Sequence, residues 1–407
     1  MKHLLLFVCT ILLLAGCRDD NSDKKTVIEG QRTVIVYMSA ENNLADNARR
    51  DIEEMLFGCK ELDNLQHLVV FLDDERSTHP VIMELKNGVC DTVVTYDNDF
   101  YASDPERFGE ILSTIIEKFP AKSYGLVLWG HAKGWLVEKD SVAQSASSRR
   151  FNAYGIDTGS NLSLPYTFGS RWMNISQMVK ALEPLPYFDF IFADCCCMMC
   201  VETAYELRHK AHYLIGSPSE IPANGAPYDT IVPLMFSTAD DFYVDIIDTY
   251  YDAYLNVSSY NNSLPLSTVD LHQMDSLAEA TRAVLKAPDD YDVTRLAYYY
   301  QDKDELPVMY DMVSLMERNL DASNYAEWLK VFNKAVPYRR FSKRWMTDIM
   351  VFDVYKSFST SLFSVDNFGG LSMFVPLHDY VYCRNYDFNN DIKKTGWYKA
   401  VDWSRFE

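Results

Sequence analysis

Positive charge is scarce in this sequence. Its 407 residues contain 38 Lys and Arg against 58 Asp and Glu, which gives a formal net charge of −20. Nucleic acids and anionic membranes bind proteins through positively charged surfaces. The composition therefore excludes nucleic acid as a partner of the folded part, and it permits peptides with basic residues as partners.

Long apolar runs are also lacking, apart from one short run near the amino terminus. This run, residues 4–14, is too short to span a bilayer stably. It follows Lys2 and leads into Leu14-Ala15-Gly16-Cys17, which is the layout of a secretory signal. Because Leu-Ala-Gly-Cys resembles the bacterial lipobox, we predict a signal peptide over residues 1–17 and lipidation of Cys17.

The residues that follow Cys17 predict how the protein is attached. Residues 18–25 are polar and charged, so we expect a flexible tether over residues 18–31. The acidic pair Asp19-Asp20 resembles the surface-export signals of Bacteroidetes lipoproteins. We therefore expect a cell-envelope protein that reaches the membrane through its lipid anchor, and the acidic pair favours the outer-membrane surface.

A disulfide framework is the third absence. Two of the nine cysteines, Cys9 and Cys17, belong to the signal, and four others crowd into residues 195–200. Adjacent cysteines rarely bridge each other without strain. One interpretation is an envelope lipoprotein whose cluster binds Cu(I) or zinc through soft sulfur ligands. Its ligands would come from Cys195, Cys196, Cys197, Met198, Met199 and Cys200, with His209 or His212. Consecutive side chains point in different directions, however, and the usual Cys-x-x-Cys spacing occurs only once in the cluster.

The pattern of apolar residues predicts an α/β fold. Strand-like runs alternate with amphipathic helical stretches through the first two hundred residues, which is typical of a mostly parallel sheet covered by helices. The main predicted strands are 33–38, 68–72, 124–129, 188–192 and 212–216, with a short antiparallel extension over 80–85 and 92–96. The main predicted helices are 43–57, 105–119, 176–182 and 201–209.

Beyond about residue 240 the pattern becomes mainly helical. We expect tyrosine-rich segments such as Tyr298–Tyr300 to pack these helices together, and we expect a late strand over residues 370–376. The predicted organisation is thus a core over residues 32–239 and a helical carboxyl-terminal region over residues 240–407. No internal repeat interrupts it.

Two segments with reactive side chains follow two of the predicted strands. His131 comes after the strand 124–129, and Cys195, Cys196 and Cys197 come after the strand 188–192. Reactive residues of open parallel sheets collect beyond the carboxyl ends of the strands. If these strands are neighbours, the imidazole can take a thiol proton and the resulting thiolate can attack a carbonyl carbon. Gly130 and Gly134 would let the histidine loop turn tightly and present backbone N–H groups to an oxyanion.

The same two segments resemble those of clostripain-like cysteine peptidases. Leu-Trp-Gly-His-x-x-Gly-Trp, within residues 124–135, is similar to the catalytic-histidine segment of that family. Residues 188–207 are similar to its nucleophile segment, Asp-Ala-Cys-Leu-Met followed by Glu-Val-Ala-Tyr-Glu-Leu. Alignment on Glu202–Leu207 places Cys196 on the family's nucleophile and Asp194 on its acid two residues earlier. Residues 33–43, 215–228 and 370–376 show further similarity in the family's order.

The resemblance implies a caspase-like α/β/α sandwich and a cysteine endopeptidase that cleaves after Arg, and less readily after Lys. It implies Cys196 as nucleophile, His131 as base, and Asp194 with Glu220 as pocket acids. Gly130 and Ala132 would form the oxyanion loop, although Ala132 stands where the family usually has Gly. Calcium is a candidate cofactor on the same ground. Family members are often matured by self-cleavage after the histidine strand, here residues 138–150, where Lys139, Arg149 and Arg150 are suitable sites.

The departure at Ala132 also keeps a third interpretation open. In it, the protein is an inactive homologue that serves as a surface interaction protein.

Overall fold

The computed structural model describes most of the chain after the expected signal and tether. The described residues are 29–137, 154–161, 171–255, 264–301, 306–341, 345, 350–351, 354–355, 368–383 and 386–407. The predictions for Cys17, for residues 1–28 and for the loop 138–150 lie outside them. Within the described residues, no helix has the length and apolar character needed to cross a membrane.

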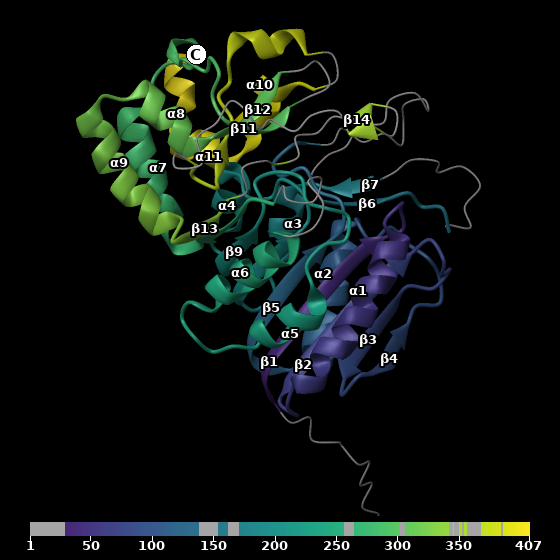
Figure 1. Ribbon diagram of the computed structural model, residues 1–407. Helices are drawn as coiled ribbons and strands as arrows, with labels where there is room; N and C mark the ends of the chain where they lie inside the picture. Colours follow the sequence, from purple (N-terminus) through teal and green to yellow (C-terminus); the bar gives the residue numbers. More distant parts are fainter. Residues whose placement is uncertain are drawn as a thin grey trace, which may run out of the picture.

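A nine-stranded sheet in the order β13-β10-β9-β8-β5-β1-β2-β3-β4 forms the centre of the molecule (Figure 1). Its strands are β1 (Gly30–Ala40), β2 (Gln66–Asp74), β3 (Val81–Lys86), β4 (Val89–Thr95), β5 (Ala121–Trp129), β8 (Phe188–Asp194), β9 (Ala211–Gly216), β10 (Leu266–Asp270) and β13 (Tyr338–Arg340). The five strands from β9 to β2 are parallel. The strands at both edges are antiparallel. The predicted mostly parallel sheet and its antiparallel extension are confirmed.

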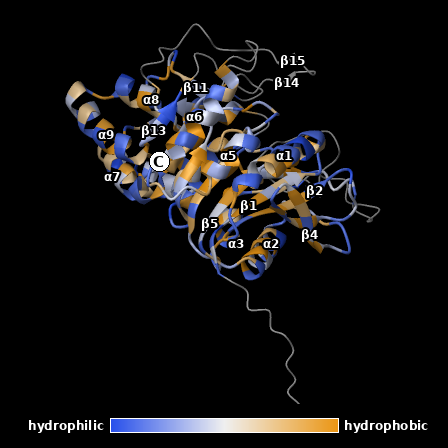
Figure 2. Cartoon of the chain, turned by 60° about the horizontal axis from the view of Figure 1, so that its bottom comes forward, coloured by the Kyte–Doolittle hydropathy of each residue, from blue (hydrophilic) through white to orange (hydrophobic). Residues whose placement is uncertain are grey.

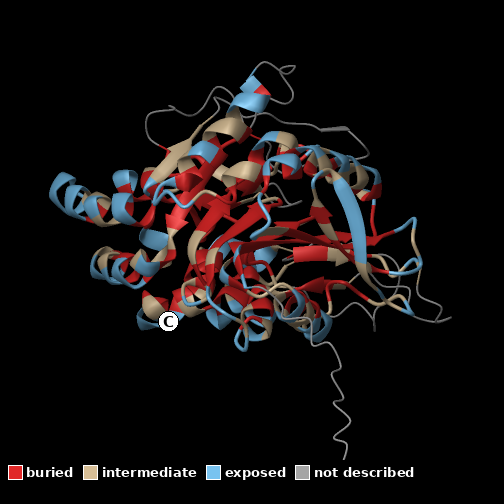
Figure 3. Ribbon diagram, turned by 90° about the horizontal axis from the view of Figure 1, so that it is seen from below, coloured by how far each residue is buried: buried red, intermediate tan, exposed pale blue. Residues whose placement is uncertain are grey.

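Helices cover both faces of the sheet and bury the central strands β1, β5 and β8 almost completely, whereas the edge strand β4 is largely exposed. In β1, Val34, Val36 and Met38 face the helices α1 (Ala45–Gly58), α5 (Tyr228–Leu234) and α6 (Phe242–Leu255). Ile35 and Tyr37 face the opposite layer, which contains α2 (Pro105–Lys118), α3 (Ile175–Ala181) and α4 (Val201–Leu207). Figures 2 and 3 show apolar, buried strands between helices whose outer faces are polar and exposed. A strand covered on both sides is apolar without alternation, which is why these strands were predictable.

Helix α2 shows how local sequence defines an element. Asp104 accepts hydrogen bonds from the backbone N–H groups of Glu106 and Arg107, and Pro105 occupies the first helical position. Both features stabilise a helix start. Of the two predicted caps, Ser103 and Asp104, the structure uses Asp104.

The chain beyond residue 240 contains more strand than the sequence pattern indicated. Its further helices are α7 (Met274–Val284), α8 (Met312–Asn319), α9 (Ala322–Ala335), α10 (Phe388–Asp391) and α11 (Gly396–Ala400). Tyr298–Tyr300, predicted to pack helices together, instead belongs to β11 (Tyr298–Gln301). This strand forms a small sheet with β12 (Pro307–Asp311) and β16 (Ser372–Met373), the latter inside the predicted late strand. Aromatic residues favour strands when one face is buried, and Tyr299 and Tyr300 are buried here.

Two short strand pairs and one edge of the central sheet differ from the predicted organisation. β6 (Tyr154–Asp157) pairs with β7 (Arg171–Met173), and β14 (Met350–Val351) pairs with β15 (Val354–Tyr355). β10 and β13 belong to the region after residue 240, yet they extend the central sheet. The division near residue 240 stays a prediction, and the two regions share one sheet.

Candidate active site

The sheet places the histidine and cysteine segments side by side. β5 and β8 are parallel neighbours, and Trp129 at the end of β5 pairs with Asp194 at the end of β8. His131 lies two residues beyond Trp129, and Cys196 lies two residues beyond Asp194. The two side chains therefore start from equivalent positions at one edge of the sheet, as the sequence predicted for neighbouring strands.

Close backbone packing holds the two loops together. A Cβ atom on Gly134 would lie 2.6 Å from the carbonyl oxygen of Cys197 and 2.9 Å from the Sγ of Cys200, and Gly134 has a φ of +59°. A side chain would disturb both the contact and the conformation. Glycine at this position therefore lets the histidine loop lie directly on the cysteine loop.

Cys196 differs from its two neighbours in accessibility. Cys195 and Cys197 are fully buried, whereas Cys196 is half-buried. Its Sγ accepts a long hydrogen bond, 3.5 Å, from the backbone N–H of Ile221. Burial raises the pKa of Cys195 well above its ordinary value. Of the three adjacent thiols, Cys196 is thus the one that a substrate can approach, which agrees with the alignment.

The described cysteines of the cluster do not converge with other Cys, His, Asp or Glu ligands on a metal site. Cys200 Sγ lies 3.0 Å from Thr203 Oγ1, to which it is hydrogen-bonded. Within the described parts of the chain, no group of three or more converging His, Cys, Asp or Glu ligands includes a cysteine. The geometry therefore does not support the soft-metal interpretation.

A side chain that the sequence did not single out orients the histidine. His131 Nε2 lies 2.8 Å from Asn43 Oδ1. An amide oxygen only accepts hydrogen bonds, so Nε2 carries the proton and Nδ1 of the neutral ring is left as the basic atom. Burial, with a smaller contribution from the positive charge of Lys133, lowers the pKa of His131 to about 4. The ring is therefore neutral at physiological pH and able to accept a proton.

The segment that begins at Tyr154 also supports the histidine loop. The backbone N–H of Gly155 donates to the carbonyl oxygen of His131 at 2.8 Å. Ala132 forms a backbone bridge with Tyr154, whose hydroxyl donates to the carbonyl oxygens of Tyr37 and Trp129. These contacts fix the backbone around His131 from two elements far apart in sequence.

The residues predicted for the oxyanion loop adopt restricted conformations. Gly130 has a φ of +137°, and a Cβ there would lie 2.9 Å from the carbonyl oxygen of Ser39. Ala132 is buried beside Tyr154. Both residues therefore belong to the tightly packed histidine loop, and their role toward an oxyanion stays a prediction.

The two predicted pocket acids have different surroundings. Asp194 is buried, and its carboxylate accepts hydrogen bonds from the hydroxyls of Tyr228 and Tyr250 and from the backbone N–H of Ala226. Burial raises its pKa. Glu220 is half-buried and immediately precedes Ile221, the residue that contacts Cys196 Sγ. The backbone that follows Glu220 thus lies beside the thiol, and Asp194 is buried two residues before Cys196.

A group of buried carboxylates elsewhere fits calcium. One ligand oxygen each from Glu41, Asp73 and Asp99 lie within 4.8 Å of one another, and two calcium ligands are separated by at most about twice the Ca–O distance of 2.3–2.6 Å. Among the described atoms, both oxygens of Asp73, both of Asp99 and Oε2 of Glu41 have no hydrogen-bond partner. Buried carboxylates without partners are costly unless a cation compensates them. These residues could therefore hold a hard, oxygen-liganded cation.

A sheet whose neighbouring strands lead into a histidine and an accessible cysteine is an arrangement compatible with a cysteine peptidase of the α/β class. Comparisons with known proteins identify the group. The sequence profile of the clostripain family, the C11 peptidases, matches residues 36–407. The chain belongs to the clostripain family of cysteine proteases and is a hydrolase.

Solved structures agree with this assignment. A secreted C11 cysteine protease from Bacteroides thetaiotaomicron, in complex with an irreversible peptide inhibitor, matches with a TM-score of 0.76 at 28% identity over 92% of this chain and 100% of that one. An inactive zymogen C11 protease from Parabacteroides distasonis gives a TM-score of 0.75 at 26% identity over 92% of this chain and 99% of the other. No curated protein matches the chain. The predicted caspase-like fold is confirmed.

Proposed function

We propose that this protein is a lipid-anchored cell-envelope endopeptidase that cleaves after Arg, and less readily after Lys, through a Cys196–His131 dyad. The observation that carries the proposal is the paired arrangement at the ends of β5 and β8, with an accessible thiol on one loop and a neutral, oriented imidazole on the other. The envelope location rests on the lipobox-like residues before Cys17. A related protease from Bacteroides thetaiotaomicron is described as secreted, which is compatible with export of this chain.

Two acids support the preference for a basic residue. A carboxylate can bind a guanidinium through two parallel hydrogen bonds, which an ammonium cannot reproduce. Glu220 is the more exposed of the two acids, whereas Asp194 would act as a buried charge held by the hydroxyls of Tyr228 and Tyr250. Both residues remain proposed determinants, and the contribution of each is measurable.

Cleavage of a fluorogenic peptide panel that varies only the residue before the cut tests this specificity. Wild type should cleave after Arg fastest. Glu220→Gln should lower kcat/KM for the Arg substrate by roughly 10- to 100-fold, because a charge-assisted bond is lost, and Asp194→Asn should lower it to a similar degree. Neither change should alter cleavage after neutral residues as strongly.

The same panel shows how the specificity proposal could fail. Fast wild-type cleavage after Asp or after large apolar residues would contradict the basic preference itself. An unchanged Arg preference in both variants would remove Glu220 and Asp194 from the pocket. Either result would leave the family assignment and the dyad in place.

Calcium is proposed as the cation of the Glu41, Asp73 and Asp99 site. Asp157 adds negative charge beside these residues, since its repulsion contributes to the raised pKa of Asp73. The carboxylate of Asp157 accepts from Ala102 N and Gly159 N. A bound cation would join the residue after β1 (Glu41), β2 (Asp73) and the segment between β4 and α2 (Asp99). Glu41 also accepts hydrogen bonds from Ser160 and Asn161, in the segment that supports the histidine loop.

Calcium should raise the melting temperature of the inactive Cys196→Ala variant, because a ligand that binds only the folded state stabilises it. Asp99→Asn in that background should lose most of this increase. Asp97→Asn provides the matched control, because Asp97 is an exposed acid two residues away. Equal responses of both variants to calcium and to a chelator, measured by differential scanning fluorimetry, would contradict the site.

A further inference from the structure

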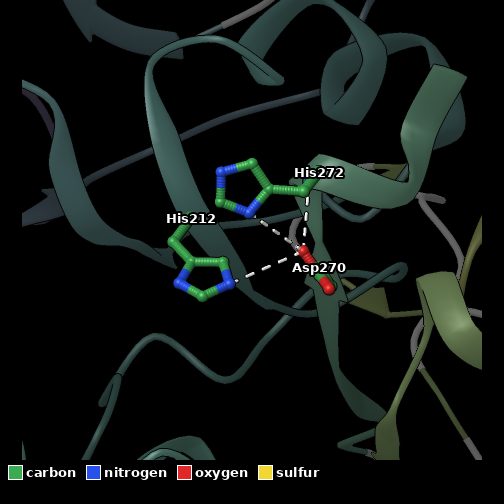
Figure 4. A group of neighbouring side chains, drawn as sticks. All are labelled: His212, Asp270 and His272. Carbon is green, nitrogen blue, oxygen red and sulfur yellow. Dashed lines mark hydrogen bonds and ion pairs between the residues drawn. The ribbon is translucent and has the colours of Figure 1, made fainter.

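Three potential metal ligands meet at the end of the sheet opposite to the cysteine and histidine loops. They are His212 in β9, Asp270 at the end of β10 and His272 in the 3-10 turn Leu271–Gln273. Figure 4 shows both imidazole rings directed toward the carboxylate of Asp270. One ligand atom of each residue lies within 4.8 Å of the other two, although the residues come from two strands and a turn.

The separations fit a shared metal ion better than direct hydrogen bonds. His272 Nδ1 lies 3.5 Å from Asp270 Oδ1, and His212 Nε2 lies 3.7 Å from the same oxygen. A nitrogen–oxygen hydrogen bond is normally about 2.7–3.2 Å long. Zinc–ligand bonds of about 2.0–2.2 Å in a tetrahedral arrangement separate adjacent ligand atoms by about 3.4 Å. The observed separations are close to this value.

Surrounding contacts hold the ligands in place. The hydroxyl of Tyr187 lies 2.8 Å from His272 Nε2. Nε2 therefore has a hydrogen-bond partner, and Nδ1, which lies near Asp270, is the nitrogen available to a metal ion. His212 stacks on Tyr213, with ring centroids 4.0 Å apart. Asp270 Oδ1 accepts the backbone N–H of His272 at 3.0 Å. Outer contacts of this kind orient the ligands of most protein metal sites.

We propose that His212, Asp270 and His272 bind a zinc ion, with water or another small ligand in the fourth position. Two imidazoles and a carboxylate are a donor set that zinc prefers. The side chains of His212 and His272 are 40% and 53% exposed, so the ion has access from solvent. The strongly negative protein would also attract cations.

The location predicts a structural role for this site. His212 is the second residue of β9 and Tyr187 immediately precedes β8, so the cluster lies at the start of strands whose other ends carry Cys196 and its neighbours. Asp270 and His272 belong to the region after residue 240. The ion would join that region to β9 at the point where Asp270 pairs with Tyr213. Zinc binding at this site would be independent of the proposed peptidase specificity.

Metal titration of the untagged, full mature chain tests the proposal. The Cys196→Ala variant is used because a cysteine and histidine pair can itself bind zinc. Co²⁺ should give the visible absorption of a tetrahedral site, and calorimetry should show one bound Zn²⁺ that raises the melting temperature. The double variant His212→Gln, His272→Gln should lose this binding, while His209→Gln, an exposed histidine nearby, should retain it.

Two further measurements distinguish a specific zinc site from nonspecific binding by surface histidines. Tyr187→Phe should weaken zinc binding by about 10- to 100-fold, as expected when a metal ligand loses the hydrogen bond that orients it. When Cys196 is kept and zinc is removed from the buffer, the double variant His212→Gln, His272→Gln should cleave peptides as fast as wild type. Equal zinc affinity with and without His212 and His272, or no binding in the presence of both, would overturn the proposal.

Discussion

Replacing Cys196 by alanine is expected to lower peptide cleavage by several orders of magnitude, since the nucleophile and its base act as one unit. Cys196 is the half-buried member of three adjacent cysteines, and the other two are fully buried. The substitution removes one sulfur atom at the surface of the site, so the fold should persist. Steady-state rates with an Arg-containing peptide, together with circular dichroism of the variant, measure both effects.

The neighbouring cysteines supply matched controls for this prediction. Cys195→Ala and Cys197→Ala should retain most of the activity and lose some stability, because each leaves a small cavity in the core. An irreversible peptide inhibitor should label Cys196 in the wild type, as located by mass spectrometry. Loss of activity in Cys195→Ala but not in Cys196→Ala would show that the alignment is wrong by one residue. A fully inactive wild type would restore the interpretation as an inactive homologue.

Replacing His131 by alanine is expected to have an effect as large as the loss of Cys196, because no other described imidazole follows the end of β5. The low pKa of His131, about 4, keeps the ring in its basic form above that pH. The acid limb of kcat/KM reports ionisations of the free enzyme. We therefore expect this limb below pH 6.5, the ordinary value for histidine.

Asn43 should act as a positioning residue for His131. Asn43→Ala removes the acceptor 2.8 Å from Nε2 and should lower kcat by roughly 100-fold, because small misplacements of a catalytic group are costly. Asn43→Asp keeps an acceptor but adds a negative charge, which raises the pKa of the imidazole. The acid limb of Asn43→Asp should therefore move to higher pH while KM changes little.

The pH profile distinguishes positioning from a merely structural role. If Asn43 only stabilised the loop, Asn43→Ala and Asn43→Asp would change stability without moving the acid limb. Thermal melts recorded in parallel would show this. An acid limb at or above pH 6.5 in wild type would contradict the low pKa assigned to His131.

The polar networks illustrate where sequence-based prediction stops. Asp194 was predicted to be a pocket acid from its position two residues before Cys196, but its three partners come from residues 226, 228 and 250. Asn43 is one polar residue after a strand in the sequence, and its contact with His131 spans 88 positions. The proposed zinc ligands come from a strand before the predicted division at residue 240 and from a strand and a turn after it. None of these contacts has a periodic signal that a single sequence could reveal.

The sequence by itself determined the main strands and helices of the core and the two segments with reactive side chains, and its resemblance to the clostripain family predicted Cys196 as the nucleophile. Strands buried on both faces are continuous apolar runs, and Asp104 with Pro105 starts a helix, so these signals are local. Only the tertiary structure decided the strand order, the strands β10, β11 and β13, and the partners of each functional side chain. The physical reason is that propensity and periodicity act over a few residues. Strand order and side-chain contacts depend on packing across the whole core, which brings together residues that lie far apart in the chain.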